Sequence, residues 1–99
     1  VKERTLSRSI MSQVADSMLQ IQGVEASFVI AVSGGDTCIS ARSSGKINVQ
    51  RIMESMGGGG HLTAAACQKP KSSVDQVRSE LLTTIDSYFR EEHTDESDT

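Results

Sequence analysis

Residues 26–42 read Ala-Ser-Phe-Val-Ile-Ala-Val-Ser-Gly-Gly-Asp-Thr-Cys-Ile-Ser-Ala-Arg, and this stretch predicts a β-hairpin. The apolar run Ala26 to Val32 shows little alternation, which is typical of a strand covered on both faces. Ser33-Gly34-Gly35-Asp36 is a turn signal, and a second strand is expected from Thr37 to Arg42. Side chains alternate along a strand, so the second strand has two different faces. One face carries Ile39 and Ala41, and the other carries Cys38, Ser40 and Arg42.

Helices are predicted on both sides of the hairpin. Before it, apolar residues recur at spacings of three and four and indicate an amphipathic helix that ends near Gln22, with Gly23 as its stop. Its apolar positions are Leu6, Ile10, Met11, Val14, Ala15, Met18 and Leu19. After the hairpin, Asn48 is a good N-cap for a second helix that ends at Gly57. The apolar stripe of this second helix is Val49, Ile52, Met53 and Met56.

The C-terminal third adds one more strand and one more helix. Residues 64–68 fit either a strand or a helix, and we favour a short strand because Pro70 follows at once. Ser73 and Gln76 form a capping box that introduces the last helix. The core side of that helix is Val74, Val77, Leu81, Ile85, Tyr88 and Phe89.

The predicted fold is a single α/β domain, with three helices packed on a small sheet of about three strands in the order α-β-β-α-β-α. Ninety-nine residues suffice for one hydrophobic core. The domain is expected to span residues 1–90, and the polar, acidic residues 91–99 are expected to form a disordered tail.

Charge and composition narrow the classes of ligand. The net charge of −3 hides an uneven distribution, because five acids lie in residues 91–99 while residues 1–90 carry 10 basic and 8 acidic residues. This balance fits a small anionic ligand, and the 3% aromatic content argues against a platform for long nucleic acid. No stretch approaches the roughly 20 apolar residues of a membrane span, so a soluble domain is expected. Because the first residue is Val1 rather than Met and an amphipathic pattern begins at once, we expect a segment cut from a longer polypeptide or a processed product. Cys38 and Cys67 are expected to be reduced thiols in the core, and the sequence leaves open whether they form a disulfide.

The run Met56-Gly57-Gly58-Gly59-Gly60-His61-Leu62-Thr63 holds half of the eight glycines, directly before one of two histidines. A glycine turn can present successive backbone N–H groups as an anion-binding concavity. It can also be a helix cap followed by a flexible connector, and local composition does not separate the two. His61 could bind a phosphate or a base, but one interior histidine cannot make a metal site, so no metal is expected here.

Arg42 is the second candidate for anion binding. A guanidinium can hold two phosphate oxygens at once, and Ser43, Ser44 and Gly45 add hydroxyl groups and a flexible turn. The alternative is a surface salt bridge. No catalytic triad, paired carboxylates or Walker A motif accompanies these residues, so no catalytic residue is expected in this chain.

These motifs resemble a known family. Ile39-Ser40-Ala41-Arg42-Ser43, then Ile47-Asn48-Val49, then Gly57 to His61 with small residues after it are similar to the DHH-associated domain of the first type, over residues 3 to 90. Within that family they most resemble the membrane-anchored cyclic di-AMP phosphodiesterases of Gram-positive bacteria.

The resemblance implies a division of labour. A DHH catalytic domain in the same polypeptide would hold two Mn²⁺ ions, and this domain would clamp a cyclic dinucleotide or a short oligonucleotide. Carried over by position, Arg42, Ser43 and Ser44 would bind phosphate, and Gly58, Gly59, Gly60 and His61, with Thr63, would cradle phosphate or base. A nanoRNA hydrolase, a single-strand exonuclease and a non-catalytic nucleotide-binding module stay open, as does a homodimer. The resemblance also implies a cytoplasmic domain of a membrane-anchored bacterial protein.

Overall fold

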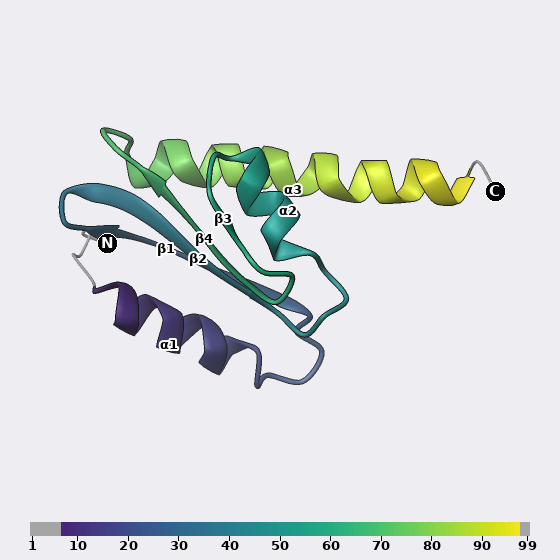
Figure 1. Ribbon diagram of the computed structural model, residues 1–99, viewed down its shortest axis with the longest axis horizontal. Helices are drawn as coiled ribbons and strands as arrows, with labels where there is room; N and C mark the ends of the chain where they lie inside the picture. Colours follow the sequence, from purple (N-terminus) through teal and green to yellow (C-terminus); the bar gives the residue numbers. More distant parts are fainter. Residues whose placement is uncertain (1–6, 98–99) are drawn as a thin grey trace.

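The computed structural model describes residues 7–97, which form three helices and a four-stranded antiparallel sheet in the order β1-β2-β4-β3 (Figure 1). The elements are α1 (Arg8–Met18), β1 (Ala26–Ser33), β2 (Asp36–Ser43), α2 (Val49–Ser55), β3 (Gly59–Gly60), β4 (Ala64–Lys69) and α3 (Val74–Ser97). The predicted order α-β-β-α-β-α is confirmed, with the two-residue strand β3 as an addition. Leu6, placed on the first helix by its sequence pattern, lies outside the described residues.

The predicted hairpin is confirmed as β1 and β2. The strands pair in register from Ala26 with Ser43 to Ser33 with Asp36. Gly34 and Gly35 both have positive φ, 62° and 89°, which a two-residue type I′ turn requires. The turn therefore sets the register that places the residues of β2 on their two faces.

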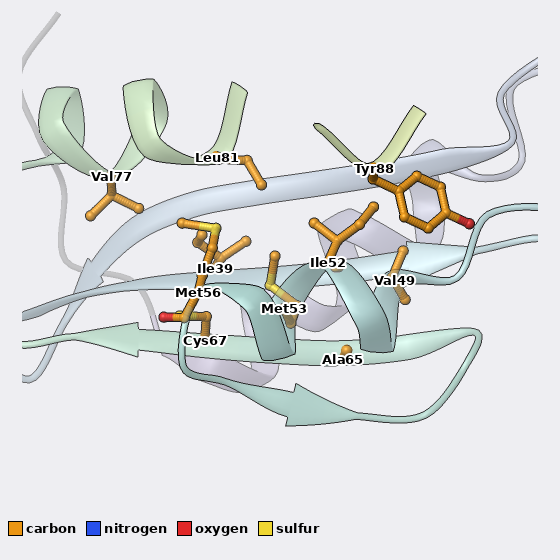
Figure 2. Packing of buried hydrophobic residues seen from close by; sticks show 11 residues of the cluster. Ile39, Val49, Ile52, Met53, Met56, Ala65, Cys67, Val77, Leu81 and Tyr88 are labelled. Atoms are coloured by element: carbon orange, nitrogen blue, oxygen red, sulfur yellow. The ribbon is translucent and has the colours of Figure 1, made fainter. Parts of the chain in front are cut away.

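The hydrophobic core lies on one face of the sheet, under α2 and α3 (Figures 1 and 2). Ile39 and Ala41 of β2 point to this face, as do Ala65 and Cys67 of the neighbouring strand. The stripe predicted for the second helix is fully buried. Asn48 caps that helix by accepting a hydrogen bond from the N–H of Arg51 (3.1 Å). Tyr88 closes the core at one end, and its hydroxyl accepts from the N–H of Asn48 (3.0 Å).

Helix α1 covers β1 and β2 on the opposite face of the sheet (Figure 1). Met11 and Ala15 are completely buried there, and the Ser27 hydroxyl donates to the carbonyl of Ala15 (2.7 Å). The other apolar positions of this helix pack less closely than their spacing predicts. Ile10, Val14 and Met18 are 38–47% exposed. The reason is that a helix lying flat on two strands buries only a narrow stripe, here one turn apart at Met11 and Ala15.

The first half of the glycine run, residues 57–60, ends a helix, and the second half forms a strand. Gly57 and Gly58 end α2 in a Schellman motif, in which the Gly57 N–H donates to Glu54 (3.1 Å) and the Gly58 N–H donates to Met53 (2.8 Å). Gly59 and Gly60 then form β3, which pairs with Ala66 and Ala65 of β4. The helix-cap reading of Gly57 is thus confirmed. The rest of the run is strand rather than flexible connector, because β4 offers it a free edge.

Helix α3 begins as predicted and extends further than expected. The Gln76 N–H donates to the Ser73 hydroxyl (3.1 Å), and the Gln76 side chain accepts from the Ser73 N–H (2.9 Å), which completes the capping box. The helix continues to Ser97, so residues 91–97 are helical where a disordered tail was expected. No glycine or proline interrupts this stretch, and Glu91 pairs with Arg51 of α2 (2.7 Å). Residues 98 and 99 lie outside the described part.

Both cysteines are free and buried, and the sheet separates them. Cys67 faces the core with Ile39, whereas Cys38 faces α1 with Met11. Side chains that leave opposite faces of a sheet cannot close a disulfide without moving the backbone. None of the helices in residues 7–97 is long and apolar enough to cross a membrane.

Candidate functional site

Arg42 lies near the end of β2, on the face that α1 covers. Its Nε donates to Asp16 Oδ1 of α1 at 2.9 Å, and Nη1 donates to the carbonyl of Ala41 at 2.8 Å. The Arg42 side chain is 18% exposed and that of Asp16 is 62% exposed. The salt bridge considered as an alternative therefore exists. It also holds the guanidinium in one orientation, with Nη2 making no hydrogen bond to the residues that the structure describes.

Asp16 is the partner that the sequence did not reveal. It lies 26 residues before Arg42, on a different element, and nothing in the local pattern joins the two. Its carboxylate can orient Arg42 for a ligand, and it also competes with a phosphate for the same cation.

Ser43 and Ser44 organise the chain after the strand. The Ser43 side chain is buried, and its Oγ accepts hydrogen bonds from the N–H groups of Gly45 (3.0 Å) and Ile47 (3.3 Å). Ser44 is exposed, and its N–H donates to the carbonyl of Glu25 (3.0 Å). Phosphate binding by either hydroxyl stays a prediction.

The turn formed by residues 61–64 lies beside Arg42. Ala64 is the register partner of Arg42, and the Ser43 N–H donates to the carbonyl of Thr63 (2.9 Å). The turn closes on itself through the His61 N–H and the carbonyl of Ala64 (2.7 Å). His61 and Thr63 are both exposed. The structure thus brings the Arg-Ser motif and the Gly-His motif, 18 residues apart in the chain, to one end of the sheet.

Only two of the four glycines in residues 57–60 adopt a positive φ, and one of the others is packed closely against β4. Positive φ occurs at Gly57 (93°) and Gly60 (146°), whereas Gly58 and Gly59 have no positive φ. A Cβ on Gly58 would lie 2.1 Å from the carbonyl oxygen of Ala66, so this glycine permits close approach to β4. The N–H groups of Gly57, Gly58 and His61 already have partners within the chain. Cradling of an anion by this loop therefore stays a prediction, with fewer donors available than a free loop would offer.

Within the described residues, no three His, Cys, Asp or Glu side chains gather where they could hold a metal ion.

Comparison with known proteins places these motifs in a family. The model of the DHHA1 domain matches residues 1–91. A cyclic-di-AMP phosphodiesterase PdeA of Listeria monocytogenes is 48% identical over 84 residues, which are 84% of this chain and 13% of that protein. A cyclic-di-AMP phosphodiesterase GdpP of Bacillus subtilis is 47% identical over 89 residues, which are 89% of this chain and 14% of that protein.

Among solved structures, the chain resembles a pGpG-specific phosphodiesterase, PggH, of Vibrio cholerae. The TM-score is 0.51 at 24% sequence identity, over 64% of this chain and 24% of the other. This likeness concerns the fold. The family match covers the hairpin, the glycine run and the helices that hold them, and the chain belongs to the DHHA1 domain family.

Proposed function

We propose that this domain binds the substrate of a metal-dependent phosphodiesterase, and that the substrate is cyclic di-AMP. The observation that carries the proposal is the meeting of Arg42 with the exposed turn of His61 and Thr63 at one end of the sheet. Support for the substrate comes from the relatives named cyclic-di-AMP phosphodiesterases, of which this chain spans 13–14%.

A DHH domain of the same polypeptide would hold two Mn²⁺ ions, which would supply an activated water and polarise the phosphodiester. The residues of this chain bind and orient. Arg42 offers a charge that is fixed in direction by Asp16, and a phosphate oxygen can take the place of the carboxylate at the guanidinium. Holding the substrate in one geometry lowers the entropic part of the barrier. The 99-residue chain alone is therefore expected to bind the nucleotide and not to hydrolyse it.

Substitution of Arg42 tests the proposal. Arg42→Ala should weaken cyclic di-AMP binding by about 1.5–3 kcal/mol, or roughly 10- to 150-fold, the range for charge-assisted hydrogen bonds. Arg42→Lys should rescue only part of this loss, because an ammonium lacks the planar fork. Arg51→Ala is the matched control, since Arg51 also pairs with a carboxylate but on the opposite side of the sheet.

Binding is measured by calorimetric titration of the chain with cyclic di-AMP. Hydrolysis is measured as the formation of linear dinucleotide by the complete polypeptide, which carries the DHH domain. The melting temperature of Arg42→Ala should change little, because the partner Asp16 is well exposed. Binding and hydrolysis equal to the parent in both Arg42 variants would refute the proposal.

A further inference from the structure

One hydroxyl of the sheet, that of Ser40, differs from the others in its hydrogen bonding within residues 7–97. Four small hydroxyl residues are at most 5% exposed: Ser27, Thr37, Ser40 and Ser43. Three of them are hydrogen-bonded, Ser27 to Ala15, Thr37 to Ser72 (2.6 Å), and Ser43 to two backbone N–H groups. Ser40 makes no hydrogen bond to any residue in the described part of the chain. Every fully buried side-chain nitrogen and oxygen atom in residues 7–97 has a hydrogen-bond partner, so the Ser40 hydroxyl keeps contact with solvent and is free to bond a ligand.

The Ser40 side chain opens into a pocket of about 390 Å³. The pocket lies on the α1 side of the sheet, where α1 covers β1 and β2 while Ala66 and Gln68 of β4 stay exposed. Ser12 of α1 forms one wall, and the backbone at Gly57 and Gly58 forms another. No residue lining this pocket carries a charge. A neutral pocket with a few hydrogen-bonding groups suits an uncharged ligand group rather than a phosphate.

The pocket adjoins the proposed phosphate site. Ser40 and Arg42 share one face of β2, and two residues along a strand are about 7 Å apart. Two residues of α1, one helical turn apart, lie opposite these two residues of β2. Asp16 pairs with Arg42, whereas Ser12 lines the pocket beside Ser40. A charged site and a neutral site therefore lie side by side on the same strand. This separation matches the phosphate and the base of one nucleotide.

We propose that this pocket binds a nucleobase, with Ser40 Oγ as a hydrogen-bonding group to the edge of the base. The inference rests on the proposed function and adds the residue that reads the base. The Cβ-free backbone at Gly57 and Gly58 and the small side chain of Ala66 leave room for a flat ring. Gln68, oriented by its hydrogen bond to the Asp36 carboxylate, is the second polar group in reach.

Two variants test the pocket, and one serves as control. Ser40→Ala should weaken cyclic di-AMP binding about three- to tenfold, because one hydrogen bond to the base is lost. Ala66→Leu should abolish measurable binding by filling the pocket from an exposed position. Ser27→Ala is the control, because its hydroxyl is buried on the neighbouring strand but bonded to Ala15. That variant should lower the melting temperature and leave the affinity unchanged.

Inorganic phosphate is the second probe, since it has no base. Ser40→Ala and Ala66→Leu should bind phosphate like the parent, whereas Arg42→Ala should bind both probes less well. In the parent, cyclic di-AMP should shift the NMR amide signals of Ser40, Gly58 and Ala66, and phosphate should not.

The outcomes separate the two proposals. If Ser40→Ala and Ala66→Leu bind cyclic di-AMP like the parent while Arg42→Ala does not, the base pocket is wrong and the proposed function stands. If Arg42→Ala also binds like the parent, or if the parent shows no binding, the proposed function is refuted and the base pocket with it.

Discussion

Alanine substitution at two adjacent glycines, Gly58 and Gly59, should give opposite results. A Cβ on Gly58 would lie 2.1 Å from the carbonyl oxygen of Ala66 and 2.8 Å from the Cα of Cys67. Both are backbone atoms, so β4 must move by about 1 Å to restore normal contact, and overpacking of this kind costs about 1–3 kcal/mol. A Cβ on Gly59 meets nothing within 4 Å and the residue has no positive φ. Its substitution should change stability by less than about 1 kcal/mol.

Thermal unfolding of the purified chain, followed by circular dichroism, measures both variants. One kcal/mol shifts the melting temperature of a domain of this size by about 4–8 °C, so Gly58→Ala should melt about 5–20 °C below the parent. Gly59→Ala should stay within about 5 °C of it. Because Gly59→Ala keeps the fold, its effect on hydrolysis also reports directly on the loop as a ligand site. Equal melting temperatures for the two variants would refute the packing of the glycine run against β4.

Three further outcomes are expected. His61→Ala should leave the melting temperature nearly unchanged, because His61 is exposed and its backbone hydrogen bond to Ala64 persists. The same substitution should impair hydrolysis by the complete enzyme, and turnover equal to the parent would show that His61 is not part of the site. Burial raises the pKa of the Cys67 thiol, so its contribution to stability is present below the ordinary thiol pKa and is lost as pH rises through the raised value. Urea midpoints from neutral to alkaline pH should therefore fall less in Cys67→Ala than in the parent, and identical slopes would contradict this. Truncation after Arg90 removes an ion pair in which Arg51 and Glu91 are more than half exposed, worth about 0–1 kcal/mol, so unfolding should stay cooperative. A truncated chain without a cooperative transition would show that the end of α3 belongs to the domain.

Local patterns predicted the elements of this protein well, because each depends on neighbours in the chain. The hairpin follows from two β-rich runs around Gly34 and Gly35, whose positive φ suits the turn. The capping box and the Asn48 cap are contacts between residues three apart, and both form as predicted. Period-two alternation also placed Arg42 on the correct face of its strand.

Tertiary structure decided what depends on contacts between distant segments. The sequence could not tell a glycine connector from a strand, because β3 exists only through its pairing with β4. It could not show that Asp16 would hold Arg42, nor that Ser40 would line a pocket together with residues of α1 and β4. The extent of α3 depends on a distant contact in the same way, since composition reports the lack of an apolar stripe but not the contact of Glu91 with α2. Elements follow from short-range propensity, whereas the site is made where strands and a helix from separate parts of the chain meet.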